Sequence, residues 1–443
     1  MSQTAPQGAN PVYDLVGVGF GPSNLALAIA VHERNAGAHD PVTAVFLERQ
    51  ARFGWHRGML LGDATMQVSF LKDLVTLRNP TSGFSFLCYL KDRDRLSDFI
   101  NQKNFFPLRV EFHDYLEWAA AKVTGMVRYG CEVTAVAPVI RDGVVEAFDV
   151  TVSGAGSYRA RNLVVATGLR PQCPPGITPS ERVWHSRDLL SHIDGLADAD
   201  PSRFVVVGAG QSAAEVTAFL HERFPTAEVC GVFSRYGYSP ADDSPFANRI
   251  FDPAAVDDYF HAAAEAKTML MDYHGNTNYA VVDTELIEAL YRREYREKVS
   301  GIRRLRLMNV SRLVDAKDDG DRVLVSVESL ASGEFTLLDA DVLICATGYR
   351  SVDPFPLLGD AARCYRRDEA GRPVVERDYR ISAERSVRAG VYLQGGTEHT
   401  HGITASLLSN AAVRAGEILD SIAARRLLGA GVLDDVLDVQ LLA

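Results

Sequence analysis

Apolar and polar positions follow the same order at two separate places in the chain. An apolar run over 12–17 is followed by helical spacing over 23–33 and by a second apolar run over 42–47. A further apolar run over 204–207 again leads into a helix-like stretch. Short buried strands that alternate with helices are typical of a parallel sheet covered by helices. The pattern therefore predicts an α/β fold that contains two such units.

A glycine-rich turn joins strand to helix in each unit. The turns read Gly-Val-Gly-Phe-Gly-Pro from position 17 and Gly-Ala-Gly-Gln-Ser-Ala from position 208. Glycines in this context let the backbone approach a pyrophosphate, and the N-terminus of the following helix favours its negative charge. Both turns predict dinucleotide sites. The expected contacts are Gly17, Gly19, Gly21 and Pro22 in the first turn, and Gly208, Gly210, Gln211 and Ser212 in the second.

Two later apolar runs, 162–168 and 342–348, each end in Ala-Thr-Gly and help to divide the chain. Between them, residues 240–300 interrupt the alternation with a loop and then helical stretches. We predict two Rossmann-like dinucleotide-binding domains with an inserted, mostly helical substrate-binding region. The expected divisions are 1–195 for the first domain, 196–345 for the second with the insertion at about 240–300, and 346–443 for a return to the first domain and a C-terminal tail.

The residue at the end of the second strand indicates which nucleotide each unit prefers. An acid at this position accepts from a ribose hydroxyl, and Glu48 stands there in the first unit. An unphosphorylated ribose, as in FAD, fits that acid. The second unit has no acid there and offers Arg235 instead. Because a guanidinium suits a 2′-phosphate, the sequence favours NADPH over NADH.

Composition and charge narrow the possible functions. The 443 residues carry a net charge of −11, which argues against a nucleic-acid or basic membrane surface. The six cysteines include no Cys-x-x-Cys pair, which argues against a flavin disulfide reductase and indicates a reducing compartment. The first eleven residues lack an export signal. We therefore expect a cytoplasmic protein without membrane or nucleic-acid partners.

Seven segments together resemble the microbial N-hydroxylating flavin monooxygenases, which act on L-ornithine or L-lysine in siderophore and related peptide biosynthesis. The segments are GVGFGPSN from Gly17, MQVSFLKD from Met66, RNPTS from Arg78, GAGQSAAE from Gly208, DDSPFAN from Asp242, NTNY from Asn276 and ATGY from Ala346. The resemblance covers about residues 12–420 and is strongest to the bacterial L-ornithine N5-monooxygenases. Cys345 departs from the usual Leu or Phe, which we assign to core packing.

The resemblance implies a definite chemistry and assembly. NADPH reduces FAD, O2 adds to the reduced ring as a C4a-hydroperoxyflavin, and NADP⁺ stays bound while the neutral side-chain amine of L-ornithine takes one oxygen atom. The product is N5-hydroxyornithine. The flavin does the chemistry, so no catalytic side chain is assigned. Family members often assemble as tetramers, so we expect a homo-oligomer.

The resemblance also assigns site residues. The expected substrate contacts are Lys72, Asn248, Asn278 and Ser409. Further FAD contacts are Trp55, His56, Gln67, Leu407 and Leu408, while Gln67 and Asn278 also contact NADPH. Each assignment has a structural alternative. Lys72 could form an ion pair with Asp73, and the two asparagines could cap loops. Arg109 is expected either to contact a cofactor or to form a salt bridge. No metal is expected, because His399 and His401 have no clear third ligand.

Two other functions stay open. The first is the same reaction on L-lysine or a diamine. A lysine pocket would be longer by one methylene, a difference worth about 1–3 kcal/mol in binding free energy. A diamine enzyme would not need Lys72 to pair a carboxylate. A non-catalytic flavin redox sensor is the alternative from another class. Lys72, Asn248 and Asn278 argue against a sensor, since it needs no amino-acid pocket.

Overall fold

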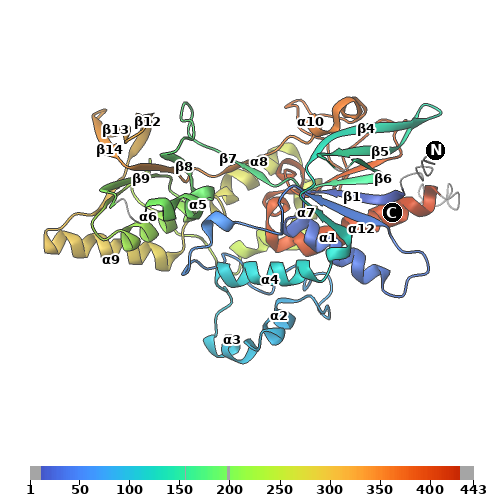
Figure 1. Cartoon of the computed structure of the whole chain (residues 1–443), viewed down its shortest axis with the longest axis horizontal. Helices are drawn as coiled ribbons and strands as arrows, with labels where there is room; N and C mark the ends of the chain where they lie inside the picture. The colour runs from blue at the N-terminus through green and yellow to red at the C-terminus, as the bar shows by residue number, and fades with distance from the viewer. Residues whose placement is uncertain (1–10, 155, 197–199, 430–443) are drawn as a thin grey trace, which may run out of the picture.

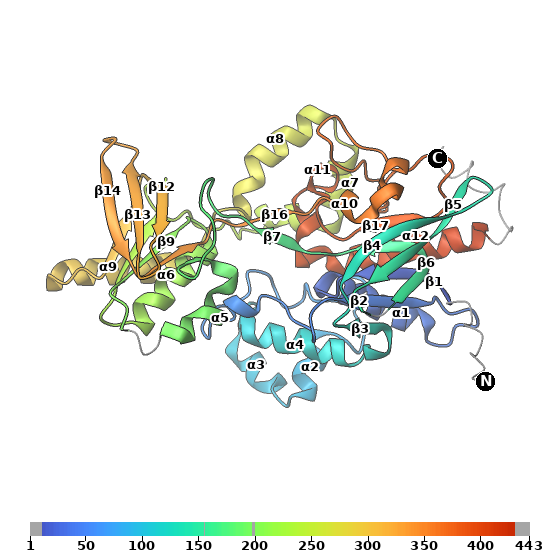
Figure 2. The ribbon, with the colours of Figure 1, turned by 45° about the horizontal axis from the view of Figure 1, so that its top comes forward.

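The computed structural model describes residues 11–154, 156–196 and 200–429 of the chain. Two α/β units lie side by side along its long axis, and the first and last described elements, β1 and α12, belong to the same unit (Figure 1). Each unit is built on its own sheet, and a helical region bridges them (Figure 2). The predicted α/β fold with two dinucleotide-binding domains is confirmed.

The first sheet combines a parallel part with an antiparallel part. Its order is β3-β2-β1-β6-β5-β4, and β17 pairs with β6 in parallel. The strands are β1 (Val12–Val18), β2 (Ala44–Glu48), β3 (Val127–Tyr129), β4 (Val133–Arg141), β5 (Val144–Val152), β6 (Gly156–Val165) and β17 (Gly390–Leu393). Packed around it are α1 (Pro22–Asn35), α4 (Arg109–Ala121) and α12 (Ala411–Gly429). Because α1 is buried from Leu25 to Val31, it anchors the first glycine turn in the core.

The second sheet is entirely parallel, in the order β11-β10-β9-β15-β8. Its strands are β8 (Val183–His185), β9 (Arg203–Val207), β10 (Glu228–Val232), β11 (Leu305–Met308) and β15 (Val342–Cys345). Helix α6 (Gln211–Arg223) follows β9 and packs on the sheet. A small antiparallel sheet, β12 (Ser311–Asp318), β13 (Val323–Ser329) and β14 (Phe335–Ala340), covers the other side. Nearly all side chains of β9 and β15 are buried, as their unbroken apolar runs predict.

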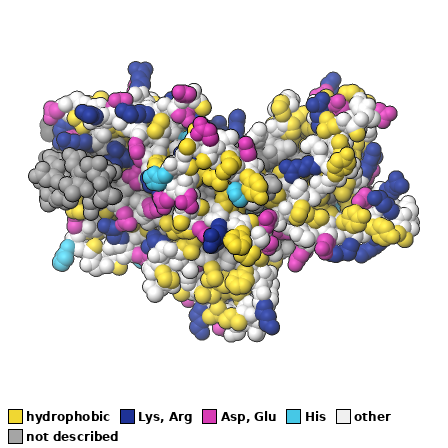
Figure 3. Space-filling view, turned by 180° about the vertical axis from the view of Figure 1, so that it is seen from behind, with side chains coloured by type: hydrophobic (Ala, Val, Ile, Leu, Met, Phe, Trp, Pro, Cys, Tyr) yellow, Lys and Arg dark blue, Asp and Glu magenta, His cyan; other side chains and the backbone are white. Residues whose placement is uncertain are grey.

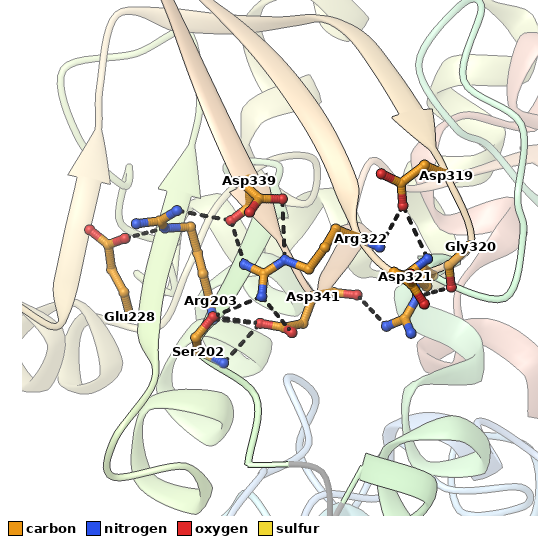
Figure 4. Close-up of polar contacts among 10 residues, drawn as sticks. Ser202, Arg203, Glu228, Asp319, Gly320, Asp321, Arg322, Asp339 and Asp341 are labelled. Carbon is orange, nitrogen blue, oxygen red and sulfur yellow. Dashed lines mark hydrogen bonds and ion pairs between the residues drawn. The ribbon is translucent and has the colours of Figure 1, made fainter.

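An ion-pair network fastens the small sheet to the second unit (Figure 4). Asp341 accepts hydrogen bonds from the backbone N–H groups of Ser202 and Arg203 at 2.8 and 2.9 Å. Arg322 pairs with the same carboxylate at 3.1 Å. Burial acts to raise the pKa of Asp341, but these hydrogen bonds hold it below its usual value. The acid just before the second Ala-Thr-Gly strand therefore has a structural role.

The chain crosses between the two units twice at one place. Strands β7 (Leu169–Pro171) and β16 (Tyr349–Ser351) lie antiparallel there and, among the described strands, pair only with each other. Because β8 already belongs to the second sheet, the chain enters that sheet before residue 195. The division at 195/196 stays a prediction. The expected C-terminal tail, 430–443, lies outside the described residues.

The segment 240–300 is mostly helical, as its sequence predicts. It holds η5 (Ala247–Phe251), α7 (Pro253–His261), α8 (Ala264–His274), η6 (Gly275–Thr277) and α9 (Thr284–Ser300), where η marks a 3-10 helix. Helix α7 packs on α11 (Glu398–His401) of the first unit, whereas α9 packs on α6 of the second. A Cβ at Gly402 would lie 3.1 Å from the ring of Tyr259, which shows how closely α7 approaches the first unit.

The remaining helices are short and lie mainly in the loop-rich parts of the chain. They are η1 (Arg57–Met59), α2 (Phe86–Asp92), α3 (Leu96–Gln102), η2 (Thr124–Met126), η3 (Ser186–Asp188), α5 (Leu189–Ile193), η4 (Asp194–Leu196), α10 (Phe355–Leu358), η7 (Gly359–Cys364), η8 (Ile403–Ser406) and η9 (Leu408–Asn410). Within the described ranges, no helix has the length and apolar character needed to cross a membrane.

Candidate active site

The first glycine turn leaves room for a phosphate at the start of α1. Gly19 has a φ of 85°, and a Cβ there would lie 2.5 Å from the carbonyl oxygen of Ala166, so only glycine fits. At Gly21, by contrast, a Cβ would meet nothing within 4 Å. Pro22 is the first residue of α1, where its missing N–H costs no hydrogen bond. This open helix N-terminus fits a pyrophosphate.

Glu48 lies at the end of β2, as predicted, and also organises the turn beside it. Its carboxylate accepts from the backbone N–H of Phe20 at 2.7 Å and from that of Gln50 at 2.8 Å. The side chain is buried. Because a carboxylate has about four acceptor sites, two remain for a ribose hydroxyl. The arrangement fits the proposed ribose contact.

A buried polar chain supports this turn from behind and was missed by the sequence interpretation. Asn24 donates to the carbonyl of Gly19 at 2.7 Å, and Gln394 donates to Asn24 at 3.1 Å. Arg414, fully buried at the start of α12, donates to Gln394 at 3.1 Å. Burial lowers the pKa of Arg414. Asn24 ends the GVGFGPSN segment, but no local motif marks Gln394 or Arg414, because they stand about 370–390 positions after it in the sequence.

The side chain of Asn410 indicates, independently of the glycine turn, that a ligand binds in the first unit. It is buried at the end of η9, next to Ser409, and neither of its amide atoms has a hydrogen-bond partner among the described residues. A buried amide without partners is costly, so such groups mark an absent partner. A flavin ring carries donors and acceptors along its edge and fits this requirement. The residues present therefore fit FAD.

The second glycine turn has the same close packing as the first. Gly208 has a φ of 141°, and a Cβ there would lie 2.3 Å from the carbonyl oxygen of Ala346. At Gly210 a Cβ would lie 3.3 Å from the Cα of Ala280, in the loop before α9. Gln211 and Ser212 open α6. The turn fits a second dinucleotide, with the insertion's loop lying close against it.

Gln67 and Gln211, predicted to contact NADPH, converge on Asp283 from opposite units. Their side-chain amides donate to the same carboxylate oxygen of Asp283 at 2.7 and 2.9 Å. The backbone N–H of Asp283 in turn donates to Gln211 at 2.9 Å. Burial raises the pKa of Asp283, and the two amide hydrogen bonds do not cancel that effect. Asp283 thus links a glutamine of the first unit to a glutamine at the start of α6 in the second.

Arg109 forms a salt bridge, the second of its two expected roles. Its guanidinium donates to both carboxylate oxygens of Glu215 on α6, at 2.7 and 2.9 Å. It also donates to the carbonyl of Met59 at 3.0 Å. Both charged side chains are buried. A bidentate pair of this kind ties α4 of the first unit to α6 of the second.

Arg235 follows β10 and is exposed at the end of the second sheet. Its guanidinium donates to the carbonyl of Ala280 at 2.9 Å and to the hydroxyl of Ser239 at 3.2 Å. These contacts use one of its terminal nitrogens and leave other donors facing solvent. The position and exposure fit the predicted contact with a 2′-phosphate.

Lys72 has no ion pair within the described part of the chain, and Asp73 is not its partner. Asp73 is buried and accepts from the backbone N–H groups of Val75, Thr76 and Phe86 instead. The ammonium of Lys72 lies 5.7 Å from the ring centre of Phe251 in η5. Burial lowers the pKa of Lys72, and the charge of Asp252 only partly offsets this.

The two predicted substrate asparagines lie in the insertion. Asn248, in η5, donates to the carbonyl of Asp243 at 2.7 Å, so it caps its own loop and keeps its carboxamide oxygen for another partner. Asn278 follows η6, and its neighbour Tyr279 hydrogen-bonds Glu398 of α11. Lys72 contacts Phe251 of η5, the short helix that also carries Asn248. Helix η5 also packs on η8, just before Ser409.

The remaining predicted contacts lie around the first unit. Trp55 and His56 stack edge to face with ring centres 4.8 Å apart, and His56 has a φ of 50°, a strained value typical of functional turns. Leu407 and Leu408 are half-buried and Ser409 is buried. His399 and His401 bond the carbonyls of Pro373 and Arg377. In the described residues, no group of three or more metal-ligating side chains is found.

The paired sheets and glycine turns define an oxidoreductase that holds a flavin and a nicotinamide nucleotide. A family profile described as L-lysine 6-monooxygenase/L-ornithine 5-monooxygenase matches residues 11–351. The L-ornithine N(5)-monooxygenase of Burkholderia cepacia is 42% identical over 88% of this chain and 90% of its own length. That of Pseudomonas aeruginosa is 39% identical over 93% of this chain and 94% of its own.

A solved structure agrees with these relatives. The ornithine N-hydroxylase KtzI of Kutzneria sp. 744, described as a complex with reduced FAD, NADP⁺ and L-ornithine, has a TM-score of 0.90 and 50% identity. The match covers 94% of this chain and all of that one. The chain therefore belongs to the L-lysine 6-monooxygenase/L-ornithine 5-monooxygenase family.

Proposed function

We propose that the protein is an FAD- and NADPH-dependent monooxygenase that converts L-ornithine to N5-hydroxyornithine with O2, for siderophore or related peptide biosynthesis. NADPH supplies two electrons, one oxygen atom goes to the side-chain nitrogen, and the other leaves as water. The proposal rests chiefly on the position and surroundings of Lys72. It is a half-buried ammonium without an ion pair among the described residues, beside the insertion and close to the flavin unit. Such a group fits a substrate carboxylate.

Bound FAD, once reduced by NADPH, supplies the activated oxygen. The protein's contribution is to hold the substrate by its amino-acid end, so that the side-chain amine is the only part free to approach the flavin. Lys72 pairs the carboxylate, and the oxygen of Asn248 accepts from the α-ammonium. Asn278 and Ser409 complete the pocket from η6 and η9. These four roles are supported by the convergence of their segments and by the resemblance of their motifs.

The reacting amine must be neutral, because an ammonium has no lone pair. A free alkyl amine has a pKa near ~10.4, so deprotonation at pH 7 costs roughly 4–5 kcal/mol unless the site lowers that pKa. Burial does this for a cationic amine, as it does for Lys72 in the same region. The site therefore needs a dry pocket at the amine end, and it needs no acid–base side chain.

Ornithine is favoured over a diamine because putrescine or cadaverine would leave Lys72 without its anion. Because Lys72 is half-buried, the cost of leaving it unpaired is below the about 3–5 kcal/mol of a fully buried charge, but it still favours a carboxylate-bearing substrate. Lysine differs from ornithine by one methylene, worth about 1–3 kcal/mol in an apolar pocket. The amino-acid pocket and the two cofactor sites also favour an enzyme over a redox sensor.

We further propose a cytoplasmic homo-oligomer. Six cysteines, all free in the structure, suit a reducing compartment, where NADPH is also regenerated. The resemblance favours self-association of the chain, with the tetramers of family members as the precedent.

The direct experiment measures hydroxylamine formation by the FAD-loaded protein with ornithine, lysine, putrescine and cadaverine. NADPH consumption is measured in the same reactions. The NADPH consumed in excess of hydroxylamine formed then gives the fraction of O2 that is reduced without hydroxylating the amine. We expect product with ornithine at the highest kcat/KM. Higher efficiency with either diamine would contradict the carboxylate clamp, and NADPH consumption without product for all four amines would contradict the hydroxylase itself.

A further inference from the structure

One face of helix α9 carries large apolar side chains that face solvent. Tyr291, Tyr295 and Val299 are 68%, 62% and 73% exposed, and they repeat every four residues along the helix. Side chains spaced in this way lie in a single row, one turn above the other. Ile302, just beyond the helix, extends the row and is also exposed. We call these four residues the α9 stripe.

The opposite face of α9 packs on the second unit. Leu290 is buried there, and Arg293 donates to the carbonyl of Ala218 on α6 at 3.1 Å. Glu297 accepts from the backbone N–H groups of Arg304 and Leu305 at 2.7 Å each. The stripe takes no part in these contacts. In Figures 1 and 2, α9 forms the outer end of the molecule, so the stripe is free to meet another surface.

Charges beside the stripe repeat in a self-complementary order. In two antiparallel helices related by a two-fold axis at the level of Arg293, Tyr291 lies opposite Tyr295 of the other copy. In the same register Glu288 lies opposite Lys298, and each of these exposed charges also pairs within its own helix, Glu288 with Arg292 and Lys298 with Glu294. Ile287, at the level of Val299, is half-buried against the core beside Leu290. Glu288 and Lys298 are both exposed and lie five residues, roughly 7.5 Å, on either side of the axis. In this register tyrosine thus meets tyrosine, and acid meets base.

We propose that the α9 stripe is the surface on which a second copy of this chain docks, in this antiparallel register. A two-fold contact uses the same patch on both copies, which requires the self-complementarity that α9 has. Tyrosine and arginine, frequent in α9, are enriched at protein interfaces. A membrane is a poor partner, because α9 has equal numbers of acidic and basic residues and its end of the molecule mixes both charges with apolar side chains (Figure 3).

The α9 stripe would be a contact surface of the homo-oligomer proposed above. The experiment that tests it measures association and does not depend on the hydroxylation reaction. Sedimentation velocity of the FAD-loaded full chain is measured over a range of concentrations for the unmodified protein, Glu288→Lys, Lys298→Glu and the double variant. Each single variant creates two like-charge contacts across a symmetric pair, so we expect association at this interface to weaken about tenfold or more. The double variant restores opposite charges, and we expect it to associate nearly as well as the unmodified protein.

A matched control lies elsewhere on the second unit. Phe335 on β14 is exposed to a similar degree, so Phe335→Ser tests whether loss of any exposed apolar side chain lowers association. We expect Tyr295→Ser to weaken association and Phe335→Ser to leave it unchanged. An unmodified protein that stays monomeric, or a double variant that associates no better than the single variants, would overturn the proposal. Binding of the stripe to anionic vesicles in place of self-association would overturn it as well.

Discussion

The two glycine turns of this protein both pack a glycine against the carbonyl oxygen of an Ala-Thr-Gly alanine, and they differ in what surrounds them. The first is supported by buried groups, from Glu48 in front to Arg414 behind, and a buried amide without a partner, Asn410, lies in the same unit. The second opens toward Arg235, which is exposed. The same turn is thus braced by buried polar groups in one unit, whereas in the other it lies against the loop before α9, whose Ala280 is also bound by the exposed Arg235.

The largest effect is expected where the two units are joined. Replacing Arg109 by Met removes the bidentate partner of buried Glu215 and leaves its charge unpaired, which costs about 3–5 kcal/mol in the free energy of unfolding. Chemical denaturation monitored by tryptophan fluorescence measures this change. Because removing both charges removes the penalty, Arg109→Met with Glu215→Leu should recover much of the loss. A single variant as stable as the unmodified protein would show that the pair does not hold the units together.

Asn410 provides a way to break the first site alone. Asn410→Leu removes two buried polar atoms without partners, so the apoprotein should be as stable as the unmodified one or more stable. The holoprotein should lose FAD, with the dissociation constant raised about tenfold or more if the amide bonds the flavin. Equilibrium dialysis and thermal unfolding with and without FAD separate the two effects. Equal FAD affinity in both proteins would place Asn410 outside the flavin site.

Arg235 provides the corresponding change in the second site. Arg235→Ala should lower the efficiency of flavin reduction by NADPH about tenfold or more, since a hydrogen bond to a charged group contributes about 1.5–3 kcal/mol. Reduction by NADH, which lacks the 2′-phosphate, should change little. Anaerobic stopped-flow reduction with both nucleotides measures the ratio. If the unmodified protein uses both equally well, the assignment of Arg235 fails.

The smallest effect is a pH dependence at Asp283, which holds a glutamine from each side of the junction. Because burial raises its pKa in the folded protein, the unfolded chain releases this proton more readily, and stability falls as pH rises from about 4 through the raised pKa. Asp283→Asn should remove this decline. The difference in melting temperature between the two proteins should therefore change over that window and stay constant above it. A constant difference at all pH values would argue against a raised pKa.

The sequence predicts local features of this molecule well and distant pairings poorly. Both glycine turns, the strands that lead into them and the position of Glu48 follow from patterns within about 30 residues. Asp283 could not be found in this way, because its partners Gln67 and Gln211 stand 216 and 72 positions from it. The same holds for the support that Gln394 and Arg414 give to Gly19. Tertiary packing alone creates these contacts, and no periodicity marks them.

The most direct test of the proposed function compares NADPH oxidation with hydroxylamine formation in the unmodified protein and in Lys72→Met, using ornithine and putrescine. Methionine keeps a similar length without the charge, so packing against Phe251 should survive. Flavin reduction by NADPH should continue, whereas hydroxylation of ornithine should fall about tenfold or more, because the half-buried Lys72 loses less than the about 3–5 kcal/mol of a fully buried charge pair. Hydrogen peroxide should take the place of the product. A variant that hydroxylates ornithine as efficiently as the unmodified protein, or an unmodified protein that prefers putrescine, would contradict the account.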